Sequence, residues 1–170
     1  MPITVPSLPM LDPAEITALS DLLAFRQPRR VLEWGGGGST CYYPPRYPET
    51  QWVTIESDAA WYNALRASEL ADNVMLLWLK PPEYHELARH RLGRFDLIIV
   101  DGAPKTRAAC LSRARELLTA DGVVWLHDAS HPPYQEAARA NFAHITELVP
   151  PNAAGKRGVW LLQEPRQSVL

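Results

Sequence analysis

The sequence is organised around a run of four glycines within the stretch Val31-Leu32-Glu33-Trp34-Gly35-Gly36-Gly37-Gly38-Ser39-Thr40. The residues before the glycines are typical of a short buried strand. Glycines have no Cβ and let the backbone approach a ligand closely. In an open sheet of parallel strands such a loop lies at the carboxyl edge, where ligands bind. Prolines at positions 44, 45 and 48 leave room for about one helical turn after the loop. The stretch therefore predicts a ligand-binding loop followed by a short helix.

Strands and helices alternate on both sides of this loop. The hydrophobic pattern predicts strands at 31–34, 52–56, 74–79, 95–101, 123–128, 145–149 and 159–162. It predicts helices at 13–27, 58–70, 83–92, 105–118 and 133–142. This order is typical of the α/β class. We expect a doubly wound, mostly parallel seven-stranded sheet with an antiparallel last strand, in a three-layer α/β/α arrangement.

Length and composition suit one soluble domain, because the chain has 170 residues, of which 46% are hydrophobic and 21% charged. We expect residues 1–29 to form an N-terminal extension with a helix, and residues 30–163 to form the core. The net charge of -2 gives no reason to expect a nucleic-acid partner. Neither a long apolar run nor a secretory signal is visible, so we expect a cytoplasmic protein without a membrane partner. The 2 cysteines are too few for a disulfide framework or a four-thiolate zinc site.

An acidic residue follows the glycine loop at a meaningful distance. Glu56 ends the second predicted strand, 18 residues after Gly38. An acid at about this spacing accepts hydrogen bonds from the ribose hydroxyls of a bound cofactor. A nicotinamide dinucleotide prefers a third glycine at the position of Thr40 and a helix that holds its pyrophosphate. A cofactor with ribose and adenine but no phosphate needs neither. The alternative for the glycine loop is a tight turn without a ligand, and the alternative for Glu56 is an exposed acid at the end of a strand.

Several segments resemble the class I S-adenosylmethionine-dependent methyltransferases. Residues 31–40 are similar to that family's acid-x-Gly-x-Gly motif, and residues 53–58 to the acidic strand end that follows it. Residues 95–102 and 118–128 look like its fourth and fifth strands, and the terminal strand pair resembles its reversed last strand. The likeness spans about residues 30–163. It implies a Rossmann-like fold, S-adenosylmethionine as cofactor and methyl transfer as the reaction.

The resemblance also implies cofactor contacts. The motif's acid, Glu33, and its glycines would hold the methionine moiety, Glu56 the ribose hydroxyls, and Asp101 would lie near the sulfonium. No Asp, Asn or Ser-Gln pair follows the third strand to bind adenine, so stacking on Trp78 or Trp61 is expected instead. The full expected set is Glu33, Gly35, Gly36, Gly37, Ser39, Thr40, Glu56, Ser57, Trp78 and Asp101.

Candidate catalytic residues stand at the ends of two later strands. Asp101 and Asp128 both follow apolar strands, and His127 precedes the second aspartate. Methyl transfer from a sulfonium needs an oriented nucleophile and often a base that removes its proton. We therefore expect Asp101, Asp128 and His127 to be catalytic, and helix capping is the alternative role for the aspartates. Arg107 belongs to a basic group that we expect on a solvated helix face, unless it meets an acidic substrate together with Lys105.

The two aspartates are also spaced like the metal-binding aspartates of the catechol-type O-methyltransferases, to which the chain is faintly similar. The third ligand there would be an asparagine at position 129, where this chain has Ala129. Two carboxylates and water form an incomplete set for Mg²⁺. A divalent metal is therefore not favoured, and no metal ligand is assigned.

These features together predict an S-adenosylmethionine-dependent methyltransferase that acts on an oxygen of a small molecule or sugar. The alternatives are a non-catalytic domain that binds the same cofactor or a partner protein, and an NAD-binding oxidoreductase. The chain has no inserted segment that covers a pocket. Residues 1–11, a second subunit of a homo-oligomer, or a large acceptor are the alternatives for closing it.

Overall fold

The computed structural model of the chain describes residues 3–86 and 92–164. Its strands are β1 (Arg30–Trp34), β2 (Gln51–Glu56), β3 (Val74–Trp78), β4 (Phe95–Val100), β5 (Leu118–His127), β6 (His144–Val149) and β7 (Val159–Gln163). Its helices are α1 (Pro13–Arg26), α2 (Gly38–Tyr42), α3 (Ala59–Arg66), α4 (Arg107–Leu117) and α5 (Pro132–Asn141), with a 3₁₀ turn, η1, at Pro44–Arg46. The prolines of η1 end α2 after little more than one turn, as the sequence predicts.

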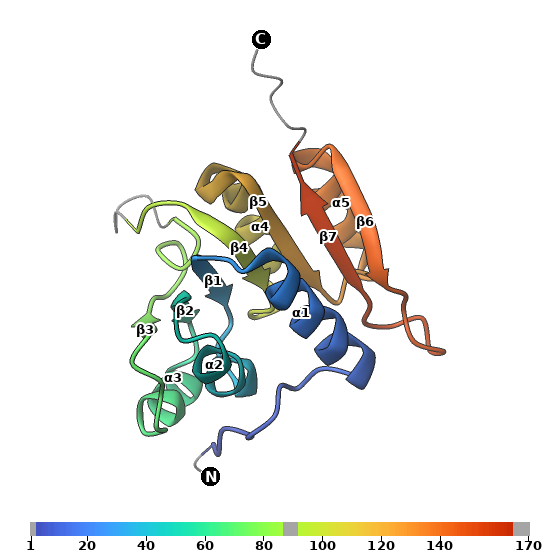
Figure 1. Ribbon diagram of the computed structural model, residues 1–170. Helices are drawn as coiled ribbons and strands as arrows, with labels where there is room; N and C mark the ends of the chain where they lie inside the picture. Colours follow the sequence, from blue (N-terminus) through green and yellow to red (C-terminus); the bar gives the residue numbers. More distant parts are fainter. Residues whose placement is uncertain (1–2, 87–91, 165–170) are drawn as a thin grey trace.

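The strands form a single seven-stranded sheet in the order β3-β2-β1-β4-β5-β7-β6 (Figure 1). The neighbouring strands β3, β2, β1, β4 and β5 are all parallel to one another. β7 runs antiparallel to both of its neighbours, β5 and β6. The predicted mostly parallel sheet with a reversed last strand is thereby confirmed. The chain order reverses between β1 and β4, and ligands bind at such a switch point in open α/β sheets.

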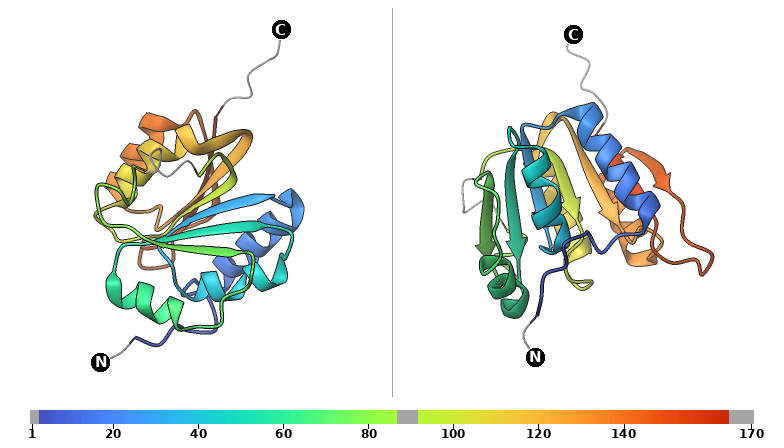
Figure 2. Two further views of the ribbon diagram at one scale, coloured as in Figure 1. Left: turned by 90° about the vertical axis from the view of Figure 1, so that its left-hand side faces the viewer. Right: turned by 60° about the horizontal axis from the view of Figure 1, so that its bottom comes forward.

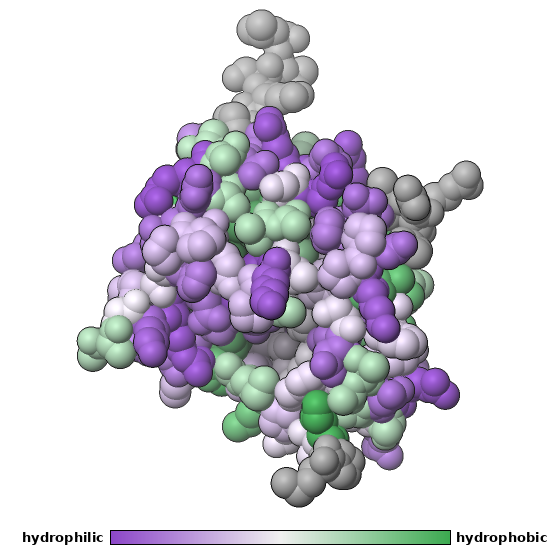
Figure 3. All heavy atoms as spheres, turned by 180° about the vertical axis from the view of Figure 1, so that it is seen from behind, coloured by the Kyte–Doolittle hydropathy of each residue, from purple (hydrophilic) through white to green (hydrophobic). Residues whose placement is uncertain are grey.

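Helices cover both faces of the sheet, which confirms the predicted three layers. On one face Leu19 and Leu23 of α1 pack with Val31, Trp52 and Trp125 of the strands. On the other face the apolar residues of α4 and α5 pack against Phe95, Ile98, Val100, Val124 and Leu126. Figure 2 (left) shows the sheet between α4 and α5 on one side and α1, α2 and α3 on the other. Seen from behind, the surface is mostly hydrophilic with scattered apolar patches (Figure 3).

Three predicted elements differ most from the structure. α3, predicted over 58–70, ends at Arg66, and a turn follows at Ala67. β5 begins at Leu118 rather than at position 123, because the chain continues as a strand past an irregularity opposite Phe95. The helix expected at 83–92 is absent from its described part, where residues 81–85 form turns, and residues 87–91 lie outside the described residues. Among the described helices, none is both long and apolar enough to cross a membrane.

The segment before α1 runs along the carboxyl edge of the sheet (Figure 2, right). A Cβ at Gly38 would lie 2.0 Å from the carbonyl oxygen of Leu8 and 2.9 Å from that of Pro6. Only glycine therefore lets this segment pass so close to the loop. Residues 1–11 are one of the three alternatives for closing the pocket. In the structure, residues 6–10 of this segment lie beside the glycine loop.

Candidate functional site

A cavity of about 470 Å³ opens at the carboxyl ends of β1, β2, β4 and β5. Its volume falls in the range of about 300–1,000 Å³ that is usual for small-molecule sites. The glycine loop, the ends of the three other strands and the N-terminal segment all contribute to its wall. The lining residues are Met10, Gly35, Gly36, Gly37, Gly38, Ser39, Glu56, Ser57, Asp58, Trp61, Asp101, Gly102, Ala103, Arg107, His127, Asp128 and Arg157.

The glycine loop is packed tightly on one side and open on the other. Gly35 has φ +95°, and a Cβ there would lie 2.4 Å from Gly102 Cα. A Cβ at Gly36 would lie 2.5 Å from the side chain of Leu65, whereas one at Gly37 would meet nothing within 4 Å. Gly35 and Gly36 thus bring the loop against its neighbours, and Gly37 leaves its side of the loop open.

Glu33 holds the loop from beneath. Its side chain is fully buried and accepts hydrogen bonds from the hydroxyls of Ser39 (2.5 Å), Thr40 (2.7 Å) and Thr54 (2.8 Å) and from Trp52 Nε1 (3.0 Å). Burial raises the pKa of Glu33, although these four bonds oppose the shift. Glu33 and Thr40 are absent from the cavity wall, while Ser39 lines it. The expected contacts of Glu33, Ser39 and Thr40 with a cofactor stay predictions.

Glu56 joins the glycine loop to the end of β2. Its Oε2 accepts a hydrogen bond from Gly36 N (3.0 Å), and its Oε1 accepts bonds from Ser57 N (2.6 Å) and Asp58 N (2.7 Å). Burial raises the pKa of Glu56, and the three backbone bonds oppose that shift. The carboxylate stands at the cavity wall at the end of β2, which is the position expected for a ribose-binding acid.

The two tryptophans proposed for adenine stacking differ in position. Trp78 is 45% exposed and stacks on Tyr62, with ring centroids 5.8 Å apart, outside the cavity. Trp61, on the first turn of α3, lines the cavity. Of the two tryptophans, only Trp61 is therefore in the cavity wall, and stacking on adenine stays a prediction for both.

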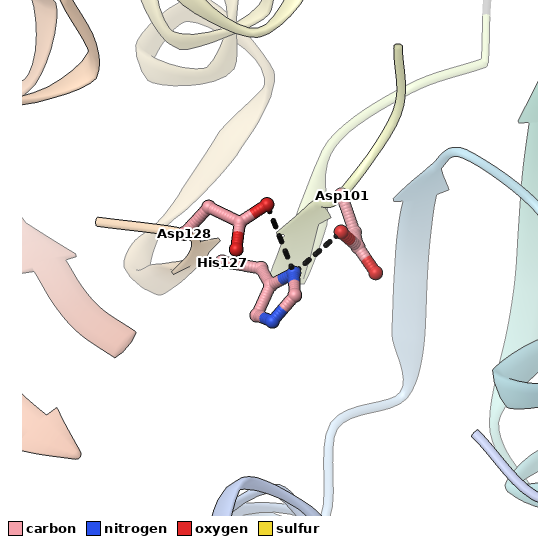
Figure 4. A group of neighbouring side chains, drawn as sticks. All are labelled: Asp101, His127 and Asp128. Carbon is pink, nitrogen blue, oxygen red and sulfur yellow. Dashed lines mark hydrogen bonds and ion pairs between the residues drawn. The ribbon is translucent and has the colours of Figure 1, made fainter. Parts of the chain in front are cut away.

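The three expected catalytic residues meet at the ends of β4 and β5 (Figure 4). His127 Nδ1 lies 2.7 Å from Asp101 Oδ1 and 3.7 Å from Asp128 Oδ2. Asp128 has φ +55°, a left-handed conformation that Asp tolerates better than most residues. Parallel strands end at the same edge, and this explains why residues 26 positions apart touch.

Two further residues complete this cluster. Arg107 forms ion pairs with Asp101 Oδ1 (3.0 Å) and Asp128 Oδ2 (2.8 Å), and it is buried rather than on a solvated helix face. That expectation was wrong because the first turn of α4 faces the strand ends. Glu15 of α1 is buried, and its Oε2 lies 3.2 Å from His127 Nε2. A glutamate at the third position of a helix indicates capping, and Glu15 does accept a bond from Asp12 N (2.8 Å). No local signal points to its contact with His127.

His127 is a cation in this environment. Burial by itself lowers the pKa of an imidazole. The hydrogen bonds to Asp101 and Glu15 and the charges of Asp101 and Asp128 outweigh burial and raise the pKa of His127 to about 10. Both ring nitrogens therefore donate to carboxylates at neutral pH. A raised pKa makes His127 a weak base, and the expected catalytic roles of the three residues stay predictions.

Known proteins match this chain in fold and not in sequence. No protein-family model matches the sequence, and no curated protein sequence matches it. Among solved structures, the O-methyltransferase TomG from Streptomyces achromogenes, in complex with SAM, matches with a TM-score of 0.68 at 23% identity, over 94% of this chain and 83% of that one. Cofactor-bound Rv0187 from MTB matches with a TM-score of 0.68 at 24% identity, over 93% and 84%. The O-methyltransferase from Bacillus cereus, in complex with SAH, matches with a TM-score of 0.69 at 17% identity, over 91% and 83%.

The chain has a methyltransferase fold. This finding confirms the fold that the resemblance of residues 31–40 and 53–58 implies, and the likeness extends over nearly the whole chain.

Proposed function

We propose that this chain is an S-adenosylmethionine-dependent O-methyltransferase whose acceptor is a small molecule or sugar. The observation that carries the proposal is the meeting of the glycine loop, Glu56 and Asp101 at one cavity of suitable volume. The cofactor-bound neighbours of the same fold support it. The net charge of -2 supports a small acceptor over a nucleic acid.

Different residues of the cavity would bind different parts of the cofactor. The carboxylate of Glu56 would accept the ribose hydroxyls, and the backbone of Gly35 to Gly37 would face the methionine moiety. Trp61 would stack on adenine. Asp101 would lie near the sulfonium, and its Oδ2 accepts no hydrogen bond from the described residues.

The same structure disfavours a dinucleotide. A pyrophosphate is normally held at the N-terminus of a full helix after the glycine loop. Here α2 has 5 residues and ends at the prolines of η1. A dinucleotide-binding sheet has a parallel sixth strand beside the fifth, whereas the antiparallel β7 stands there in this chain.

Asp128 is the proposed base. It lines the cavity with its side chain 37% exposed, and its Oδ1 accepts no hydrogen bond from the described residues. Bound S-adenosylmethionine would supply the methyl group, whose C–S bond would break with its electron pair left on sulfur as the acceptor oxygen forms the new C–O bond. Asp128 would take the hydroxyl proton of the acceptor.

Calorimetric titration tests the cofactor assignment. S-adenosylhomocysteine should bind the chain and NAD should not, and Glu56→Ala should weaken the first affinity at least about tenfold. Glu147→Ala, on the exposed part of β6, is the matched control and should bind as the wild type does. Binding of NAD alone would overturn the proposal. Binding of S-adenosylhomocysteine without turnover of any hydroxylated acceptor would favour the non-catalytic alternative.

A further inference from the structure

The guanidinium of Arg107 lies between the two aspartates at the edge of the cavity. Its side chain is 7% exposed, and it makes four hydrogen bonds. Nε donates to Gly102 O (2.6 Å), NH1 donates to His127 O (3.2 Å) and Asp128 Oδ2 (2.8 Å), and NH2 donates to Asp101 O (3.2 Å). NH2 also forms an ion pair with Asp101 Oδ1 (3.0 Å), so protein groups surround most of the five N–H donors of this guanidinium. Arg107 thus connects the loops after β4 and β5.

Cations of the protein already pair with the carboxylates at this end of the cavity. Three carboxylates, Glu15, Asp101 and Asp128, face the guanidinium of Arg107 and the imidazolium of His127. At the rim, Arg157 lies 3.7 Å from Glu15 and 3.5 Å from Asp12. A divalent ion at this place would need to displace a buried guanidinium that makes four hydrogen bonds and two ion pairs.

The donor set does not fit a divalent metal. Side-chain ligand atoms of Asp101, His127 and Asp128 lie within 4.8 Å of one another. However, His127 Nδ1 is occupied by Asp101, and one oxygen of each aspartate is occupied by Arg107. The next residue, Ala129, is buried and has no ligand atom where the catechol-type proteins have an asparagine. Mg²⁺ requires near-octahedral oxygen ligands, which these side chains do not provide.

We propose that Arg107 takes the place of the divalent cation, so that its guanidinium positions Asp101 and Asp128 and the site works without metal. The roles of the two aspartates toward cofactor and acceptor rest on the proposed function, whereas the replacement of a metal ion by Arg107 does not. Arg107 occupies one oxygen of each aspartate and leaves Asp101 Oδ2 and Asp128 Oδ1 for the cofactor and the acceptor. It is a positioning residue, because its buried guanidinium binds the two aspartates and the backbone of the loops that carry them.

Manganese titration of the full chain tests the inference, with electron paramagnetic resonance reporting bound Mn²⁺. Wild-type protein should bind no Mn²⁺ at the aspartates, so Asp128→Asn should leave the titration unchanged. Arg107→Ala should bind Mn²⁺ at least about tenfold more tightly than wild type, and adding Asp128→Asn to it should remove that binding. Arg107→Lys keeps the positive charge and should stay without the new site. Arg113→Ala, an exposed arginine on the same helix, is the matched control.

The outcomes separate this inference from the proposed function. Mn²⁺ binding by wild-type protein that Asp128→Asn abolishes would overturn the inference, as would a folded Arg107→Ala variant that binds no Mn²⁺. Should Arg107→Ala fail to fold, the comparison of wild type with Asp128→Asn decides. S-adenosylhomocysteine titrated into the same samples, with and without EDTA, tests the proposed function separately, because its affinity requires the glycine loop and Glu56 and should not respond to EDTA.

Discussion

The two ends of the cavity hold their carboxylates in opposite ways. At the glycine loop, Glu33 and Glu56 receive hydrogen bonds from hydroxyls, an indole and backbone N–H groups, which are all neutral. At the ends of β4 and β5, Asp101 and Asp128 are held by cations. Neutral donors position a carboxylate without cancelling its charge, whereas cations cancel it. The first end therefore suits the hydroxyls of a ligand, and the second depends on its internal charges.

The largest expected effect comes from breaking the neutral end. Glu33→Ala leaves four donors without their acceptor, and three of them are buried. Each buried donor without a partner costs about 1–3 kcal/mol, so the free energy of unfolding should fall by at least about 3 kcal/mol. The melting temperature should fall by at least about 6 °C. Glu33→Gln keeps an acceptor oxygen and should lose less. Chemical denaturation measures both, and Glu147→Ala is the control. A Glu33→Ala variant within about 1 kcal/mol of wild type would contradict the description of the loop.

Breaking the charged end should act on turnover rather than on cofactor affinity. Asp128→Asn removes the proposed base, and loss of a general base typically costs about 10²- to 10⁴-fold in rate. The affinity for S-adenosylhomocysteine should stay within about twofold. Asp101→Asn should lower the turnover and also the affinity for S-adenosylhomocysteine, because Asp101 faces the cofactor in the proposed function. Steady-state assays with an active acceptor and calorimetry check this, with exposed Asp72→Asn as control. Full activity of the Asp101→Asn/Asp128→Asn double variant would defeat the catalytic assignment.

The pH dependence of stability should distinguish the two ends. The pKa of His127 is raised to about 10 in the folded protein, above the ordinary value of 6.5. Its contribution to stability is therefore fully present below about pH 6.5 and is lost as pH rises towards about 10. The groups that face His127 are Glu15, Asp101, Asp128, Arg107 and Arg157.

The melting temperature of wild-type protein should consequently fall between pH 7 and 10 by more than that of His127→Gln. One pKa unit corresponds to about 1.4 kcal/mol, so the difference should be at least about 2–4 °C. Differential scanning calorimetry at several pH values measures it. Parallel profiles for the two proteins would show that the imidazolium does not stabilise the charged end.

The smallest effect concerns the aromatic wall of the neutral end. Trp61→Ala should weaken S-adenosylhomocysteine binding about tenfold, or about 1.4 kcal/mol, because stacking a base on an aromatic ring is worth about 1–3 kcal/mol. Trp78→Ala should change the affinity by less than about twofold, since Trp78 stacks on Tyr62 outside the cavity. Calorimetry with the two variants decides between the tryptophans, and a larger loss for Trp78→Ala would reverse the assignment.

Much of the site could be predicted because it follows from local pattern. Glu56 and Asp101 end apolar strands, and parallel strands place such residues at one edge whatever the helices do. The glycine loop and the prolines of η1 indicate a ligand-binding loop with a short helix in the same way. Thus the order of elements, the ligand edge and the candidate acids follow from the sequence read without its tertiary contacts.

The charged end could not be predicted because it depends on directions and distances that no local pattern contains. Glu15 and His127 are 112 residues apart and meet only because α1 packs across the sheet beside β5. Arg107 carries the same basic signal as Arg113 and Arg115, yet it alone stands on the first turn of α4, where the helix faces the strand ends. Burial then gives these pairs their strength, since charges attract more strongly away from water. Tertiary packing therefore determined which charges are paired, and with them whether a cation is already present at the site.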